Sequence, residues 1–425
     1  MDFRKKILPN GLTLLTVPMP GLESVTVTVW VKTGSRNEDG KVGGISHFLE
    51  HMVFKGSKKR PSAKAISETV DAIGGEFNAG TSKDWTNFYI KTRVGNIETA
   101  MDVLSDMVLD PILDATEIER EKGTIIQEIA MYEDTPMMHI PDVFEEVIFE
   151  GNPLGWDTAG TAKTVKTIKR SDFLAYRDIH YHPEQMMVSV VGGIDEKKSL
   201  SLVEKYFSSL KPFKGNVFKG QEFVSKQTKP QFKLQTKKSE QVHLILGFMS
   251  EGRGYSGRFA QSVLATILGG GMSSRMFTEV RERRGLAYSI QTGMSRYQEV
   301  GYLSTYAGVD VAKADQAIAV ILEQYQKLAD GKLPVSLTEL KKAKEFLKGH
   351  LALALEDTKD VTHFFADQAL FTKDILTPEE VYKKVDKVSV EDVLKEAKKL
   401  FTKDRLNLAM IGPYTNKGRF EKLLM

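Results

Sequence analysis

The run His47-Phe48-Leu49-Glu50-His51 limits what this chain can form more than any other segment. Histidines four residues apart lie one turn apart on the same face of a helix, close enough for both imidazoles to hold one metal ion. Glu50 comes directly before the second histidine and shares that face. The order H-x-x-E-H is an inverted zinc motif, in which the glutamate serves as a base and not as a ligand. The run therefore predicts a zinc-binding helix with a carboxylate beside the metal.

The residues around this run predict that the helix is amphipathic. Apolar residues recur at the spacing of one buried stripe, at Ile45, Phe48, Leu49, Met52 and Val53. The two histidines and Glu50 fall on the opposite side of the helical wheel. One face should therefore pack into a core while the other presents the polar groups. The alternative is a surface helix with two solvated histidines and a solvated glutamate.

Composition restricts both the metal ligands and the partners. The chain contains no cysteine, so zinc must be held by histidine, aspartate or glutamate. The net charge of +3 gives no reason to expect a nucleic-acid partner. No stretch approaches the roughly 18 apolar residues of a membrane span, and the first residues lack the apolar core of a signal peptide. We therefore expect a cytoplasmic protein without a membrane partner.

The order of expected strands and helices indicates two related domains. Val242–Phe248 in the second half stands where Val25–Val31 stands in the first, and the helix expected at 338–358 parallels the one at 116–135. The expected class is α+β, with two similar domains that each have a mostly antiparallel sheet and helices packed on one face, related by an internal repeat. We expect a metal-binding domain at 1–212, a linker at 213–230 and a second domain without metal at 231–425.

A catalytic zinc needs a third protein ligand and one open position. The long helix expected at 116–133 offers Glu117, Glu121 and Glu128. Glu128 lies in an apolar run, where a carboxylate needs a cation as its partner. Glu121 is seven residues earlier on the same face and can orient a ligand histidine. The alternative for Glu117 and Glu121 is an ordinary solvated stripe.

The chain carries further matching segments at Gly43–Gly56, Gly74–Ala79, Ile125–Glu128 and Arg281–Ser289. With them it resembles the pitrilysin superfamily of inverzincin peptidases, which includes insulin-degrading enzyme and the mitochondrial processing peptidase. It is most similar to the bacterial, processing-peptidase-like branch with half-length chains. The resemblance spans nearly the whole chain, and its metal motif is highly specific.

The resemblance implies roles for five residues of the first domain. One Zn²⁺ per chain would be held by His47, His51 and Glu128. Glu50 would act as the general base, and Glu121 as a supporting carboxylate.

The resemblance also implies four residues that meet the substrate. Asn78 and Ala79 would lie beside a sheet edge that binds substrate backbone. Arg281 and Tyr288, in the second domain, would contact the substrate or stabilise the oxyanion. The alternatives are a surface ion pair for Arg281 and a core aromatic for Tyr288.

The expected function is zinc-dependent endopeptidase activity on peptides or on unfolded or leader segments, bound as an extended edge strand. Zinc and Glu50 would activate the water. The resemblance implies that substrate is enclosed between two such chains, so we expect a homodimer, and a heterodimer with a related subunit is the other option. The alternative functions are a non-catalytic scaffold or partner subunit on the same fold, and a zinc hydrolase of another substrate class.

Overall fold

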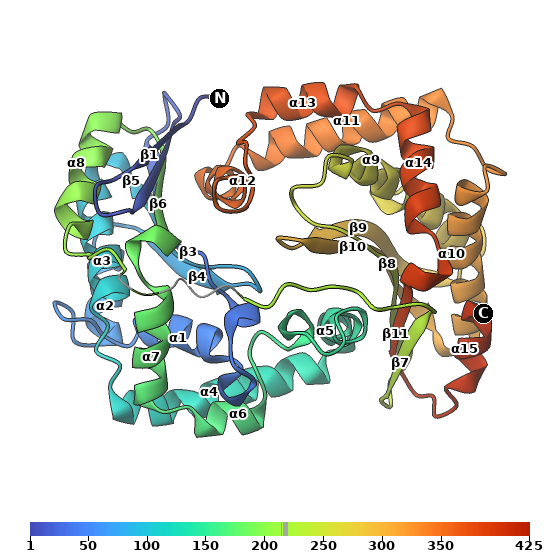
Figure 1. Ribbon diagram of the computed structural model, residues 1–425, viewed down its shortest axis with the longest axis horizontal. Coiled ribbons are helices and arrows are strands. Elements are labelled where there is room, and N and C mark those ends of the chain that lie inside the picture. The colour runs from blue at the N-terminus through green and yellow to red at the C-terminus, as the bar shows by residue number, and fades with distance from the viewer. Residues whose placement is uncertain (214, 216–219) are drawn as a thin grey trace. The chain divides into compact units, whose positions relative to one another are not determined.

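The computed structural model describes residues 1–213, 215 and 220–425. These residues form two compact units, and each unit is assembled from three stretches of the chain (Figure 1). Unit 1 consists of Met1–Ala130, Trp156–Gln221 and Ala354–Thr377. Unit 2 consists of Met131–Gly155, Glu222–Leu353 and Pro378–Met425.

The units differ from the expected domains, 1–212 and 231–425, in two segments. Met131–Gly155 packs in unit 2 although it precedes residue 212, and Ala354–Thr377 packs in unit 1 although it follows residue 231. Each segment carries one helix that covers a sheet of the other half of the chain. Within the expected linker, 213–230, residues 214 and 216–219 lie outside the described residues.

Unit 1 is built on a six-stranded sheet. Its strands are β1 (Arg4–Ile7), β2 (Thr13–Pro18), β3 (Ser24–Val31), β4 (Glu76–Thr81), β5 (Thr86–Arg93) and β6 (Met186–Gly192). Its helices are α1 (Ile45–Val53), α2 (Ala63–Asp71), α3 (Ile97–Leu109), α6 (Ala162–Thr167), α7 (Arg170–His180), α8 (Glu196–Phe207) and α12 (Thr358–Phe371), and α4 (Ala115–Asp134) starts in this unit. The strand order is β1-β2-β6-β3-β5-β4, so β4 is an edge strand.

Strand β3 shows that this sheet is covered on both faces. Its valines are fully buried in a core with residues of α1 and α3. Its alternating Val and Thr residues predict one exposed face, yet Thr26 and Trp30 are also buried. The reason is α12, which lies on the other side of the sheet from α3 and α8 (Figure 1). Thr358 Oγ1 lies 2.7 Å from Thr26 Oγ1, and the His363 ring lies 4.8 Å from the Trp30 ring.

Unit 2 is built on a five-stranded sheet in the order β7-β11-β8-β10-β9. Its strands are β7 (Gln231–Thr236), β8 (Gln241–Glu251), β9 (Ala287–Arg296), β10 (Val300–Asp310) and β11 (Leu406–Gly412). Its helices are α5 (Pro136–Ile148), α9 (Arg258–Gly269), α10 (Ala314–Ala329), α11 (Leu337–Ala354), α13 (Pro378–Asp386), α14 (Val390–Leu400) and α15 (Gly418–Leu424).

Helix α5 covers one face of the sheet in unit 2, as α12 covers one face of the sheet in unit 1. Ile140 and Phe144 of α5 join Ile245 and Ile411 of the sheet in a core that is separate from the larger core on the opposite face. Glu145 on the same helix is buried and accepts hydrogen bonds from the hydroxyls of two tyrosines of the sheet region, including one of 3.0 Å. Apolar packing and a satisfied carboxylate thus hold α5 on this face.

The two sheets repeat one topology. The order β2-β6-β3-β5-β4 in unit 1 matches β7-β11-β8-β10-β9 in unit 2, and the one parallel pair of each sheet occupies the same place. Every other strand pair is antiparallel. The expected α+β class and internal repeat are confirmed. Most helices pack on one face of each sheet, as expected, and the exchanged helix adds cover to the other.

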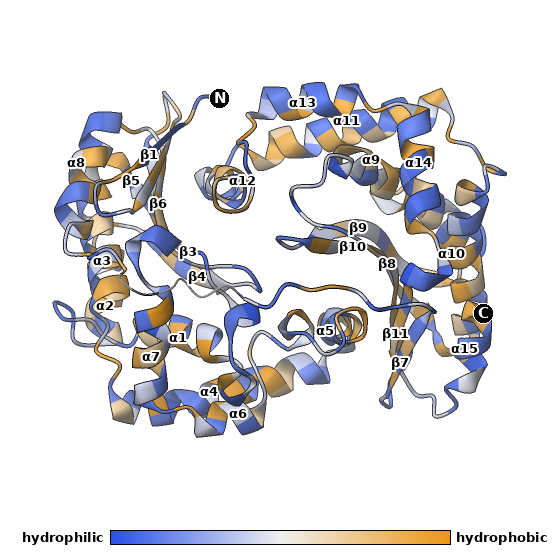
Figure 2. Cartoon of the chain, in the orientation of Figure 1, coloured by the Kyte–Doolittle hydropathy of each residue, from blue (hydrophilic) through white to orange (hydrophobic). Residues whose placement is uncertain are grey.

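The helices of both units are amphipathic. In α14, for example, Val393, Ala397 and Leu400 are buried while Lys395 and Lys398 are exposed. Figure 2 shows hydrophilic and hydrophobic residues side by side on this helix. Among the described residues, no helix combines the length and apolar character that a membrane crossing needs.

Candidate metal centre

Helix α1 forms as the sequence predicts. The apolar stripe is buried, and Phe48 packs edge-to-face on Phe173 of α7 at 4.9 Å between ring centroids. His47, Glu50 and His51 are only partly buried and lie on the side away from that core. The amphipathic pattern thus places all three polar groups on one exposed face.

A glutamate from outside the helix fixes the N-terminus of α1. The Glu38 carboxylate accepts hydrogen bonds from the backbone N–H of Gly44, at 2.7 Å, and of Ser46, at 2.8 Å. Gly44 has φ +93°, and a Cβ there would lie 2.4 Å from the carbonyl oxygen of Ala159. Only glycine fits this junction, which sets where the histidine helix begins.

Glu38 should make the stability of unit 1 depend on pH. Burial raises the pKa of Glu38 from 4.5 to about 7, against the opposing effect of its hydrogen bonds from Ser46 and Gly44. The folded state therefore binds the proton more tightly than the unfolded state. The resulting stabilisation is complete below pH 4.5 and is lost as the pH rises through about 7. Urea unfolding from pH 5 to 8 should show a loss of about 3 kcal/mol that Glu38→Gln removes. Equal pH dependence in both proteins would contradict this role.

Three side chains converge as potential metal ligands. Among the described residues, His47, His51 and Glu128 form a group whose ligand atoms lie within 4.8 Å of one another. Nε2 of His47 lies 3.7 Å from one carboxylate oxygen of Glu128, and Nε2 of His51 lies 3.5 Å from the other. Both imidazoles therefore turn the same nitrogen toward the same carboxylate, although α4 follows α1 by about 60 residues.

This spacing fits zinc. Bonds of roughly 2.0–2.1 Å at tetrahedral angles put two ligand atoms about 3.4 Å apart, close to the observed separations. Both gaps between Nε2 and a carboxylate oxygen are too long for hydrogen bonds. Two imidazole nitrogens and one carboxylate oxygen form a donor set that leaves a fourth position for water. His47, His51 and Glu128 are therefore the residues that would hold the ion.

Burial and neighbouring charges shift the pKa values of the two histidines in opposite directions. Burial, together with the charge on His51, lowers the pKa of His47 to about 4, so that His47 is neutral at pH 7. The pKa of His51 is raised instead: burial lowers it, but the hydrogen bond with Glu121 and the charge of Glu128 outweigh that effect. A neutral His47 can present Nε2 without a proton, and its lone pair can then bind a metal ion.

Glu121 contacts the ring nitrogen of His51 that does not face Glu128. Its Oε1 lies 2.9 Å from Nδ1 of His51, and its Oε2 lies 2.6 Å from Nζ of Lys55. Burial opposes the charge of Glu121, but these two hydrogen bonds hold its pKa below the ordinary value. An ionised Glu121 accepts a hydrogen bond from Nδ1–H of His51, and this leaves Nε2 of His51 to bind metal.

Glu50 is held by the edge strand. The Thr81 hydroxyl donates a hydrogen bond to Oε2 of Glu50. Burial raises the pKa of Glu50, against the opposing effects of the Thr81 bond and the His51 charge. A carboxylate with a raised pKa is suited to accept a proton near neutral pH.

Strand β4, which carries Thr81 beside Glu50, is an edge strand of the sheet in the part of the chain that the structure describes. Ser82 N–H donates to the Trp85 carbonyl, and from there hydrogen-bonded and non-bonded pairs alternate along β4 and β5. Ala79 falls in a non-bonded pair, so its N–H and C=O point to the open edge. The Asn78 side-chain oxygen accepts that N–H at 2.8 Å. Asn78 and Ala79 thus lie on the edge strand of the described sheet, and binding of substrate backbone there stays a prediction.

Arg281 and Tyr288 lie in unit 2, whereas the metal-ligand group lies in unit 1. Arg281 belongs to a π-helical segment, Phe277–Glu282, and its guanidinium lies 4.7 Å from the Phe277 ring centroid and 5.5 Å from that of Tyr288. Tyr288 is 77% exposed, so it is not a core aromatic. Their contact with substrate stays a prediction.

Sequence reasoning missed three residues of this site: Glu38, Lys55 and Thr81. Lys55 follows His51 by four residues, and helical spacing could have identified it. Glu38 and Thr81 act from outside the helix, where no periodic signal points to α1. Glu117 pairs with Arg120 and takes no part in the metal-ligand group, in agreement with the solvated alternative.

Comparison with known proteins gives matches over nearly the whole chain. Residues 14–162 match the family described as insulinase (peptidase family M16), and residues 167–347 match the peptidase M16 inactive domain. An uncharacterized zinc protease of Mycobacterium leprae is 34% identical over 98% of this chain and 93% of its own length. The uncharacterized zinc protease YmxG of Bacillus subtilis is 37% identical over 96% of this chain and 97% of its own length.

A solved structure has the same fold. A protease from Helicobacter pylori aligns with a TM-score of 0.91 at 24% identity, over 96% of this chain and 99% of that one. The match supports the fold of the chain as two related units, each with its own sheet and helices.

Proposed function

Because the chain belongs to the insulinase family (peptidase family M16), we propose that it is a zinc endopeptidase with one Zn²⁺ on His47, His51 and Glu128. The observation that carries the proposal is the approach of both Nε2 atoms to the Glu128 carboxylate, at 3.7 and 3.5 Å. The zinc proteases named among its relatives support the metal and the type of reaction.

The metal and the surrounding residues would have separate roles in the hydrolysis. Bound zinc supplies a Lewis acid that polarises the scissile carbonyl and lowers the pKa of the attacking water. Glu50 takes a proton from that water and delivers it to the leaving amine. Glu121 holds the His51 ring through Nδ1. Arg281 and Tyr288 would contact the substrate or stabilise the oxyanion, the role that the resemblance implies for them.

The substrate we propose is a peptide or an unfolded segment in extended form. The outward N–H and C=O of Ala79 can pair with a strand added at the β4 edge. Such pairing uses backbone groups, so it demands little of the substrate's sequence. The Asn78 side chain, which now accepts the Ala79 N–H, would turn aside when the strand binds.

Thr81→Val should separate catalysis from metal binding. The valine keeps the shape but removes the donor that holds Glu50, so kcat should fall about tenfold while zinc affinity is unchanged. Thr81→Ser keeps a hydroxyl and should retain most activity. Steady-state kinetics with a quenched fluorescent peptide, together with zinc titration, measures both quantities. An unchanged kcat in Thr81→Val would show that Glu50 does not depend on this bond.

We also propose a cytoplasmic homodimer, in which a second copy completes the substrate chamber, with a heterodimer as the other option. Light scattering coupled to size exclusion distinguishes a monomer from a dimer. A non-catalytic scaffold is the competing function, and the complete ligand set with Glu50 beside it favours the enzyme. Peptide cleavage that stops with a chelator and returns with zinc supports the enzyme, and inactivity with bound zinc supports the scaffold.

A further inference from the structure

Lys55 extends the row of polar side chains on α1 beyond the metal ligands. His47, His51 and Lys55 are spaced by four residues, so they lie on one face of the helical segment. The Lys55 backbone N–H donates to the carbonyl of Met52, which continues the last turn of the helix. The ammonium group is therefore carried at a defined place relative to His51.

Glu121 joins this lysine to the metal ligand. One of its oxygens meets Nδ1 of His51 at 2.9 Å, and the other meets Nζ of Lys55 at 2.6 Å. The Glu121 side chain is only 6% exposed, whereas Lys55 is 29% exposed. With a donor on each oxygen, the carboxylate plane cannot rotate without breaking a charge-assisted hydrogen bond. Lys55 thus holds Glu121 in place, and Glu121 holds the His51 ring.

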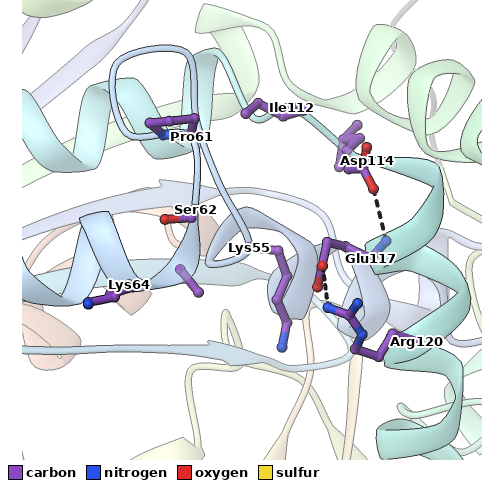
Figure 3. A pocket seen from close by; sticks show the side chains of 10 residues that line it. Lys55, Pro61, Ser62, Lys64, Ile112, Asp114, Glu117 and Arg120 are labelled. Carbon is purple, nitrogen blue, oxygen red and sulfur yellow. Dashed lines mark hydrogen bonds and ion pairs between the residues drawn. The ribbon is translucent and has the colours of Figure 1, made fainter.

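The surroundings show that Lys55 reaches Glu121 from the wall of a pocket of about 500 Å³. Figure 3 shows Lys55 beside Glu117 and Arg120 in that wall, with Ser62 and Lys64 on another part of it. Arg120 pairs with Glu117, and Lys64 lies 3.5 Å from Glu68 on the surface. Among the ion pairs in the part of the chain that the structure describes, Lys55 is the lysine that contacts Glu121.

We infer that Lys55 is a positioning residue of the metal centre, which acts on His51 only through Glu121. Without the Lys55 ammonium, one oxygen of the buried Glu121 carboxylate loses its hydrogen-bond donor. Glu121 is then no longer held in the orientation in which it accepts a hydrogen bond from Nδ1–H of His51. Removal of a group that hydrogen-bonds a ligand of zinc, as Glu121 does, typically changes metal affinity ten- to a hundredfold. The inference rests on the proposed zinc site.

The test is the zinc affinity of the full-length protein, measured by competition with a chromophoric chelator. Lys55→Met keeps the aliphatic stem and should raise the zinc Kd at least tenfold. Lys55→Arg restores a cation and should recover most of the affinity. Lys64→Met, in the same pocket wall, is the matched control and should leave the Kd within twofold. Thermal unfolding without zinc checks that each variant is folded.

A double-mutant cycle tests whether the effect passes through Glu121. In a Glu121→Gln background, Lys55→Met should cause no further loss, because its partner has already changed. Wild-type affinity in Lys55→Met, or equal losses in both backgrounds, would overturn the inference. Failure of the wild-type protein to bind zinc would instead overturn the proposed function. The two failures are therefore distinguishable.

Discussion

Glu50→Gln should lower the turnover of a peptide substrate by about 10²- to 10⁴-fold, the contribution typical of a general base. Glutamine has nearly the same shape and can still accept the Thr81 hydrogen bond, so the local structure should persist. It cannot take a proton from the attacking water. Because Glu50 lies outside the group of ligand atoms, zinc content should stay at the wild-type value.

The control for this variant is Glu117→Gln. Glu117 is a partly exposed glutamate on α4 that pairs with Arg120 and lies outside the metal-ligand group, so its loss should leave turnover within about twofold. Single-turnover cleavage and metal analysis on the same preparations measure both properties. Wild-type turnover in Glu50→Gln would refute its role as the base, and loss of zinc would assign it to the ligands instead.

Asp106→Ala should destabilise unit 1 by about 3–5 kcal/mol. The Asp106 carboxylate, on α3, accepts hydrogen bonds from Ser57 Oγ at 2.6 Å, Lys59 N–H at 3.0 Å and Arg60 Nη1 at 3.0 Å. Its side chain is 1% exposed. These contacts tie the segment after the histidine helix to α3, and alanine would remove the buried carboxylate that accepts all three hydrogen bonds. Thermal unfolding should shift down by about 10 °C.

Asp102→Ala is the matched control for the same helix. Asp102 also pairs with Lys59 and Arg60, both at 2.6 Å, but its side chain is 22% exposed and water can replace its contacts. We expect a loss of about 1 kcal/mol. Urea unfolding of the two variants compares them directly. Equal losses would show that burial does not set the importance of Asp106.

The sequence predicts the local part of the metal centre well. The 3.6-residue period identifies α1 and places His47, Glu50 and His51 opposite its buried stripe. The long helix expected at 116–133 is observed at Ala115–Asp134, and its apolar context marks Glu128. A helical period carries no information about which distant segments meet, so Thr81 beside Glu50 could not be predicted from it.

The exchanged helices were unpredictable for the same reason. The sequence of α12 does not indicate which sheet the helix covers, because that depends on contacts such as Thr26 with Thr358, which are 332 residues apart. The Val and Thr alternation of β3 describes the sheet alone and not what covers it. The internal repeat could be predicted from the sequence, because both halves of the chain contain similar elements in the same order.

The most direct measurement is peptide cleavage during removal and return of the metal, on wild-type protein and on Glu128→Gln. Glu128 contributes the carboxylate that both histidines face, and replacing it removes one of three ligands. We predict one zinc per wild-type chain, cleavage that a chelator stops and stoichiometric zinc restores, and weak zinc binding with no cleavage in Glu128→Gln. Cleavage that persists without zinc, or full zinc binding in Glu128→Gln, would contradict the account.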